Sequence, residues 1–201
     1  MSNSSKALVL LDLQNEMVHA DGALGRMGLA KIVAERQVLE NTRRALDAAR
    51  AGGVAVVHVG LGFREDYADA LSRAPRIERM KRGKIAVAGT WGSEFHQLVA
   101  PAEGEVVFVK QSVNPFVSTN IANWLQARGV RELYLAGVAT HMVVEATVRH
   151  ADDIGLVSCV LEDCCAGPNP EWHEHSIKNI IPAFGRAARV DAFLDEIGTR
   201  R

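Results

Sequence analysis

Residues 132–149 read ELYLAGVATHMVVEATVR, and this stretch predicts a buried strand that leads through a tight turn into a helix. The segment 132–137 is short and largely apolar, which is typical of a strand inside a sheet. The segment from position 143 onwards is predicted to form the first turn of a helix. A strand followed at once by a helix is the repeating unit of parallel α/β sheets, so this stretch predicts an α/β protein.

Five further segments repeat the pattern of a short apolar run bounded by polar residues. Strands that are apolar throughout, without alternation, are buried on both faces and covered by helices on both sides. The sequence therefore predicts a doubly wound, mostly parallel sheet of six strands. The other five expected strands are ALVLLD (7–12), VAVVHV (54–59), EVVFVK (105–110), LVSCVLED (156–163) and the less apolar ARVDAF (188–193).

Two helices can be placed from side-chain spacing. Apolar and small residues recur at helical intervals over 38–49, and the pair Gly52–Gly53 that follows is suited to a left-handed helix stop. A second helix is expected after Ser118 or Thr119, either of which can cap it. Gly129 is expected to end that helix.

The composition is close to neutral in charge. The 201 residues include 23 Lys and Arg and 24 Asp and Glu, for a formal net charge of −1. Without a long run of either sign, neither nucleic acid nor an anionic membrane is indicated as a partner. No apolar stretch approaches the roughly 20 residues that span a bilayer. We expect one domain over residues 1–201, a cytoplasmic location and a small-molecule partner.

Three cysteines, Cys159, Cys164 and Cys165, are odd in number and crowded into one segment, unlike a secreted disulfide framework. We expect reduced thiols that pack as small buried hydrophobic groups. A bridge between the two adjacent cysteines would be strained and is not expected. Because Cys164 and Cys165 follow the fifth strand, a position facing a cleft stays open as the alternative.

Polar residues at the ends of the expected strands point to a site. In open parallel sheets, ligands bind beyond the carboxyl ends of the strands, where the strand order reverses. Asp12 ends the first strand, Lys110 ends the third, and residues 140–143 follow the fourth. An aspartate held beside a lysine can move a proton or stabilise developing charge. Such an ion pair is also often purely structural, so both readings stay open.

Four segments together carry a family resemblance: ALVLLDLQNEM (7–17), VVFVKQSVNPFVSTNI (106–121), YLAGVATHMVVEATVRHADDIG (134–155) and VLEDCCAG (160–167). In this order they resemble the isochorismatase-like superfamily of cysteine hydrolases. The resemblance implies a three-layer α/β/α sandwich, a cleft at the strand carboxyl ends and a homo-oligomer, either dimer or tetramer. It also implies that Asp12 and Lys110 are two members of the catalytic triad and that the Val138–Ala139 peptide is cis.

The third triad position is occupied here by Val143, where the amidase branch of the family has cysteine. A helix N-terminus stabilises a thiolate, but valine offers no nucleophile. The backbone N–H groups of Met142 and Val143 are still suited to receive an oxyanion. Isochorismatases resemble this chain in lacking the cysteine, and they imply Asp12 as the acid or base, Lys110 as its partner and direct attack by water. The alternative is a catalytically silent relative that binds a small molecule or a protein.

The expected substrate contacts lie in the loops that the resemblance places around the cleft. Trp91, beside a glycine, is expected as a pocket wall or as an intersubunit contact, and His141 as a substrate contact or a helix-capping group. Phe116 and the residues of the turn 140–143 are expected to line the same pocket. The full set of expected substrate-binding residues is Gln14, Trp91, Phe116, Thr140, His141, Met142 and Val143.

No metal or other cofactor is expected. His58, Asp66 and Asp69 lie in the region where nicotinamidases carry a metal cluster, but they lack its spacing. His173 and His175 are two residues apart and would point to different faces of a helix, which makes them poor co-ligands. We expect these two histidines on a solvated face.

Overall fold

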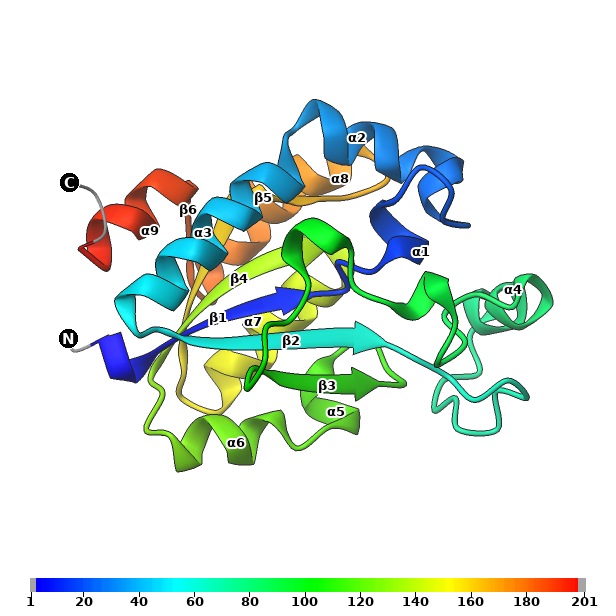
Figure 1. Cartoon of the computed structure of the whole chain (residues 1–201), viewed down its shortest axis with the longest axis horizontal. Helices are drawn as coiled ribbons and strands as arrows, with labels where there is room; N and C mark the ends of the chain where they lie inside the picture. The colour runs from blue at the N-terminus through cyan, green and yellow to red at the C-terminus, as the bar shows by residue number, and fades with distance from the viewer. Residues whose placement is uncertain (1–2, 199–201) are drawn as a thin grey trace.

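The computed structural model describes residues 3–198 and contains one parallel sheet of six strands (Figure 1). The strand order is β3-β2-β1-β4-β5-β6, and every neighbouring pair is parallel. Successive strands are added in one direction from β1 to β3 and in the opposite direction from β4 to β6, so the order reverses between β1 and β4, which is where open α/β sheets bind ligands. The strands are β1 (Lys6–Leu11), β2 (Ala55–Leu61), β3 (Val106–Lys110), β4 (Glu132–Val138), β5 (Val157–Ala166) and β6 (Arg186–Ala188).

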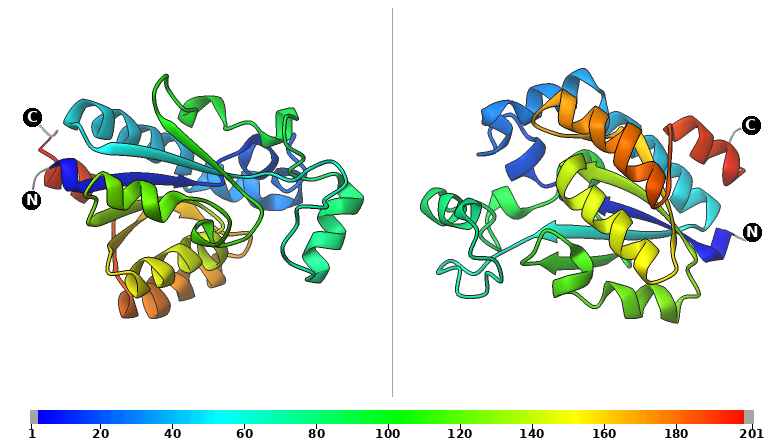
Figure 2. Two further views of the ribbon diagram at one scale, coloured as in Figure 1. Left: turned by 90° about the horizontal axis from the view of Figure 1, so that it is seen from below. Right: turned by 180° about the vertical axis from the view of Figure 1, so that it is seen from behind.

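Helices cover both faces of the sheet, which confirms the predicted three-layer α/β/α arrangement (Figure 2). Helices α2, α3 and α9 lie on one face, and α6 and α7 lie on the other. The helices are α1 (Asn15–Val18), α2 (Ala30–Glu35), α3 (Val38–Gly52), α4 (Pro75–Gly83), α5 (Pro115–Ser118), α6 (Ile121–Ala127), α7 (Glu145–Asp153), α8 (Pro170–His175) and α9 (Val190–Glu196).

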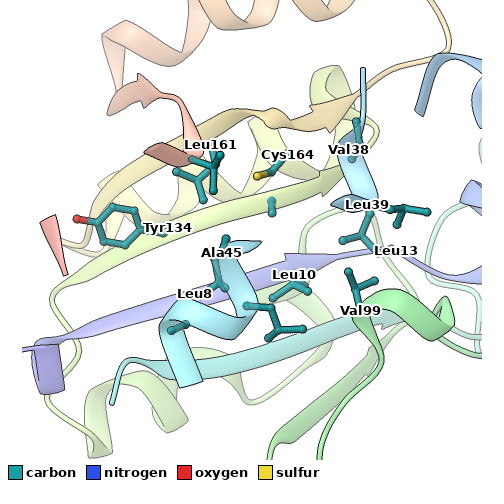
Figure 3. Close-up of a cluster of buried hydrophobic side chains, with 14 of the residues drawn as sticks. Leu8, Leu10, Leu13, Val38, Leu39, Ala45, Val99, Tyr134, Leu161 and Cys164 are labelled. Carbon is teal, nitrogen blue, oxygen red and sulfur yellow. The ribbon is translucent and has the colours of Figure 1, made fainter. Parts of the chain in front are cut away.

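The central strand β1 supplies both layers of core, because successive side chains of a strand point to opposite faces. Leu8 and Leu10 pack with side chains of α2, α3 and α9, and Figure 3 shows part of this cluster. Val9 and Leu11 pack with side chains of α6 and α7 on the other face. Every residue of β1 is buried, as its apolar run predicts.

Helix α4 stands apart from these two layers. It lies beyond the carboxyl ends of β2 and β3, at the far end of the loop that joins them (Figure 1). This excursion has a small core of its own, in which the Phe63 and Tyr67 rings stack at 5.1 Å and Ile77 of α4 packs against them.

Both helices predicted from spacing are confirmed. Helix α3 ends at Gly52 with Gly53 in the left-handed conformation, at φ 68°. Before α6, the Thr119 hydroxyl accepts a hydrogen bond from the Ile121 N–H at 3.2 Å, whereas the Ser118 hydroxyl is used by the Gln111 N–H. The N-cap position of α6 is nevertheless occupied by Asn120, whose side chain makes no capping hydrogen bond, so the prediction of Ser118 or Thr119 as the cap was wrong by one or two positions.

The sixth strand was predicted at the wrong place. The strand is Arg186–Ala188, and the segment predicted as strand, 188–193, mostly forms α9. The physical reason is that Val190 and Phe193, three residues apart, are both buried on the same side, which a helix permits and a strand does not. The other five strands lie within a few residues of the predicted ranges.

Among residues 3–198, no helix is long and apolar enough to cross a membrane.

Candidate active site

Asp12 and Lys110 meet at the carboxyl edge of the sheet. Asp12 follows β1 directly, with φ 55°, and its N–H donates to the Val59 carbonyl on β2 at 2.8 Å. Lys110 is the last residue of β3, and its Nζ donates to Asp12 Oδ2 at 2.9 Å. The two residues are only 6% and 1% exposed, so the pair is removed from bulk water.

The two oxygens of the Asp12 carboxyl group differ in their surroundings. Oδ2 is held by Lys110, whereas Oδ1 is buried and has no hydrogen-bond partner among the described residues. Burial raises the pKa of Asp12, and the Lys110 ammonium opposes part of that rise. This arrangement leaves one carboxyl oxygen available for proton exchange at a pH closer to neutral than for an exposed aspartate.

The turn after β4 lies next to this pair. Leu11 pairs with Gly137 in the sheet, so Asp12 and Val138 occupy the next positions on neighbouring strands. The Val138–Ala139 peptide is cis, as the family resemblance implied. A single π-turn, Thr140–Val144, then leads into α7.

Val143 is 2% exposed and belongs to the buried cluster that packs against α6 and α7. Its neighbour Met142 is more exposed, at 37%, and the Met142 N–H already donates to the Ala139 carbonyl at 3.0 Å. That N–H is therefore paired within the turn. Of the two backbone donors expected to receive an oxyanion, the Val143 N–H is the better candidate.

Gln14 is buried, and its amide bonds to main chain on two sides. Its Nε2 donates to the carbonyls of Leu61 at 2.9 Å and Ser93 at 2.7 Å, and its Oε1 accepts from the Leu61 N–H at 2.7 Å. Gln14 thus ties the end of β2 to the loop around residues 91–95. Its role as a substrate contact stays a prediction.

Trp91 and Phe116 contact different parts of the molecule. The Trp91 ring is 48% exposed and meets the His19 ring edge-on at 5.0 Å. The Phe116 ring stacks on His150 of α7 at 4.7 Å. The places of both rings in a substrate pocket stay predictions.

His141 is half-buried in the turn and faces Trp172 of α8, with ring centroids 4.9 Å apart. Burial lowers the pKa of His141, which favours the neutral ring. Its Nδ1 is buried without a hydrogen-bond partner among the described residues.

His173 is a residue that spacing alone misplaced. It was expected on a solvated face but is buried, at 5% exposure, whereas its neighbour His175 is exposed as predicted. The His173 ring lies 2.7 Å from the Thr140 hydroxyl through Nδ1 and 2.8 Å from an Arg36 nitrogen through Nε2. A signal was available, since His173, Ser176 and Ile177 have the i, i+3, i+4 spacing of a buried helix face.

A model of the isochorismatase domain matches residues 6–192 of the chain, and this range includes all six strands, helices α1 to α8 and the start of α9. The chain belongs to the isochorismatase family.

Curated proteins and solved structures match along nearly the whole chain. The ureidoacrylate amidohydrolase RutB of Rhizobium rhizogenes is 29% identical over 203 residues, covering 94% of this chain and 82% of the relative. The isochorismatase family protein of Desulfovibrio vulgaris is 26% identical, with a TM-score of 0.84 and coverage of 98% and 99%. A cysteine hydrolase of Pseudomonas syringae shares the fold, with a TM-score of 0.86, 21% identity and coverage of 99% and 95%. These family relationships support a hydrolase that acts on a small molecule.

The three cysteines of this isochorismatase-family chain are free and buried, which confirms their expected packing role. Burial raises the pKa of Cys159 and of Cys165 to about 12, and it raises the pKa of Cys164 as well. Thiols in this state are poor nucleophiles near neutral pH.

Within the described range 3–198, no three His, Cys, Asp or Glu side chains are grouped so that they could hold a metal ion. His58, the histidine of the region considered for a metal, pairs through Nε2 with Glu105 at 2.8 Å. The expectation that the protein uses no metal stays a prediction.

Proposed function

We propose that the chain hydrolyses a vinyl ether or a C–N bond of a small molecule by noncovalent acid/base chemistry at Asp12 and Lys110. The observation that carries the proposal is the buried Asp12–Lys110 pair with one carboxyl oxygen free of partners. A buried ion pair can often be replaced by apolar residues without loss of stability. A chain that needed only a stable core would gain little from this pair.

With a C–N substrate, Asp12 acts first as a base. Its Oδ1 takes a proton from a water molecule, whose oxygen attacks the carbonyl carbon. The same proton then passes to the leaving nitrogen as the C–N bond breaks. Lys110 holds Oδ2 throughout and offsets the charge of the carboxylate. The name of the RutB relatives, ureidoacrylate amidohydrolase, supports this branch of the proposal.

With a vinyl ether, Asp12 acts first as an acid. Protonated Oδ1 donates its proton to the enol-ether carbon, and water adds to the resulting cationic carbon. The proton lost by that water returns to Asp12 as the hemiketal collapses to a carbonyl and an alcohol. The raised pKa of Asp12 suits this branch, because it increases the protonated fraction.

Val143 supports a reaction without a covalent intermediate. Its side chain is apolar and packs into the core below the turn, so it offers no group that attacks a substrate. In the proposal, the Val143 N–H at the start of the helical segment receives developing negative charge on the substrate oxygen.

The second candidate function is binding without turnover, and Val143 is the observation that favours it. Under that reading, the Asp12–Lys110 pair serves to recognise a small molecule or a protein. The two candidates differ in one measurable respect, since only an enzyme releases product.

The test is a hydrolysis panel with isochorismate, nicotinamide and ureidoacrylate. The wild type is compared with Asp12→Asn and Val143→Cys, and with Asp47→Asn as a control at an exposed carboxylate of α3. Turnover by the wild type and by Asp47→Asn, but not by Asp12→Asn, supports the proposal. Turnover by Val143→Cys alone would reject it in favour of a silenced cysteine hydrolase whose role is binding.

The assembly and location implied by the family resemblance are further proposals. We propose a homo-oligomer, either a dimer or a tetramer, in the cytoplasm. Light scattering coupled to gel filtration measures the mass directly, against 21.8 kDa for one chain. A single peak at that monomer mass at micromolar concentration would reject the oligomer.

A further inference from the structure

Three polar side chains from distant parts of the sequence form a line that ends at the turn after β4. Arg36 follows α2, His173 lies on α8, and Thr140 opens the π-turn. The Arg36 guanidinium lies 2.8 Å from His173 Nε2, and His173 Nδ1 lies 2.7 Å from the Thr140 hydroxyl. Thr140 is fully buried and His173 nearly so.

Main-chain contacts hold the Arg36 end of this line. Arg36 Nε donates to the Cys165 carbonyl at 3.2 Å, and its terminal nitrogen donates to the Glu162 carbonyl at 3.1 Å. Both carbonyls belong to β5, which pairs with β4 in the sheet. The guanidinium is therefore held by the neighbouring strand and presents a further N–H to His173.

The chemistry of the three groups sets the direction of their protons. A guanidinium donates hydrogen bonds and cannot accept them, so His173 Nε2 must be the acceptor. The ring is then neutral and carries its proton on Nδ1, which donates to the Thr140 oxygen. The hydroxyl of Thr140 keeps its own proton for a further acceptor.

The surroundings of His173 agree with a neutral ring. Burial and the nearby Arg36 charge lower the pKa of His173 to about 4, although the Glu174 carboxylate opposes this shift. A protonated His173 ring would place its N–H donor against the N–H donor of the Arg36 guanidinium, with two positive charges in contact and no acceptor between them. Arg36 therefore donates a hydrogen bond to His173, and His173 donates one to Thr140.

We propose that Arg36 and His173 are positioning residues that hold the Thr140 hydroxyl, and with it the turn 138–143, in the geometry that the Asp12 site requires. Thr140 comes directly after the cis peptide Val138–Ala139, and Asp12 follows Leu11, which pairs with Gly137 just before that peptide. The effect on catalysis rests on the proposed function, whereas the proton arrangement does not.

The first test is independent of activity. The ¹⁵N spectrum of histidine-labelled protein reports the protonation and tautomer of each ring. The expected result is a neutral His173 with its proton on Nδ1 from pH 5 to pH 8. A His173 ring that is protonated at pH 7, or that carries its proton on Nε2, overturns the proposal whether or not any substrate is found.

The second test uses matched pairs of variants. At position 173, asparagine places an amide near Nδ1 and can still donate to Thr140, whereas glutamine places its amide near Nε2 and reaches only Arg36. At position 140, serine keeps the hydroxyl and valine removes it. His175→Asn, on the exposed face of the same helix, is the control.

Thr140→Val and His173→Gln are expected to lower kcat roughly 10- to 100-fold with KM and Tm little changed, while Thr140→Ser and His173→Asn retain most activity. Equal kcat in Thr140→Val and wild type overturns the proposal. If the wild type turns over no substrate, the proposed function fails, and the amide resonances of residues 138–143 become the readout. They are expected to shift in Thr140→Val but not in Thr140→Ser, and unshifted resonances in Thr140→Val overturn the proposal.

Discussion

Lys110 donates a hydrogen bond of 2.9 Å to Asp12, a residue 98 positions away in the sequence, although β2 lies between the strands that carry them. The bond gives the two oxygens of Asp12 different roles. Oδ2 accepts a hydrogen bond from a cation, and Oδ1 is buried without a hydrogen-bond partner among the described residues.

Removing one member of the pair is expected to cost more stability than removing both. Lys110→Met leaves a buried carboxylate without its cation, which we expect to lower the free energy of unfolding by about 3 kcal/mol at pH 7. Asp12→Asn with Lys110→Met is expected to recover at least half of that loss. Urea unfolding of the two variants measures both values. A double variant less stable than Lys110→Met would contradict the expectation.

The pH dependence of the rate is expected to identify the role of Asp12. Burial raises the pKa of Asp12, so the change from the protonated to the ionised carboxyl group occurs at a higher pH than in an exposed aspartate. A vinyl ether reaction that begins with the acid form loses rate as the pH rises through this pKa. A C–N reaction that begins with the base form gains rate over the same range. A profile of kcat/KM from pH 4 to pH 9 measures the sign, and a flat profile argues against Asp12 as the proton carrier.

Glu105 is expected to stabilise the fold in a manner that acid removes. Burial by itself raises the pKa of Glu105, but the hydrogen bonds that its carboxylate accepts from Arg50, the Ala102 N–H and His58 outweigh this and lower the pKa from an ordinary 4.5 to about 2. Because the folded-state pKa is the lower one, this stabilisation is complete above about pH 5 and is lost as the pH falls toward 2.

Glu105→Gln is therefore expected to lose about 2 kcal/mol of unfolding free energy at pH 7 and much less at pH 3. Urea unfolding at the two pH values measures the difference. The exposed Glu103→Gln, two residues away, is the control and is expected to unfold like the wild type. An equal loss at both pH values for Glu105→Gln would count against the assigned cause.

Gly137 is expected to tolerate no side chain. Its φ is 149°, and a Cβ there would lie 2.1 Å from the Leu11 carbonyl oxygen on the neighbouring central strand. Gly137→Ala is expected to lower the free energy of unfolding by about 3 kcal/mol or more, since the clash is with backbone. Gly83→Ala at the end of α4 meets only the Ile85 side chain and is expected to change stability by less than about 1 kcal/mol. Denaturation of both variants separates the two cases.

The native cysteines are expected to be unreactive and dispensable for activity. Ellman's reagent at pH 7.5 is expected to titrate fewer than one thiol in the folded protein and three after denaturation, because burial raises the pKa of each thiol. Cys165→Ala is expected to keep the wild-type kcat. Loss of activity in Cys165→Ala without loss of Tm would reveal a cysteine mechanism after all.

Much of the fold follows from local patterns. Continuous apolar runs predict five strands, and the glycine at position 53 predicts the end of α3. The expectation that these strands are buried on both faces is wrong for the edge strand β3, where Val107 is 43% and Val109 49% exposed. The sixth strand was misplaced because the apolar spacing of Val190 and Phe193 suits a helix once both side chains face the same core. That choice depends on the neighbouring α3 and β5, which contribute to the same cluster.

The amino-acid sequence by itself determined which residues end the strands, and hence that Asp12, Lys110 and the turn 140–143 share one edge of a parallel sheet. Only the tertiary structure decided that Lys110 bonds to one oxygen of Asp12 and leaves the other unpaired. It alone brought His173 to Arg36, 137 positions away. Local periodicity records which face of an element is buried, whereas the partner of a buried polar group depends on which elements the chain brings together in space.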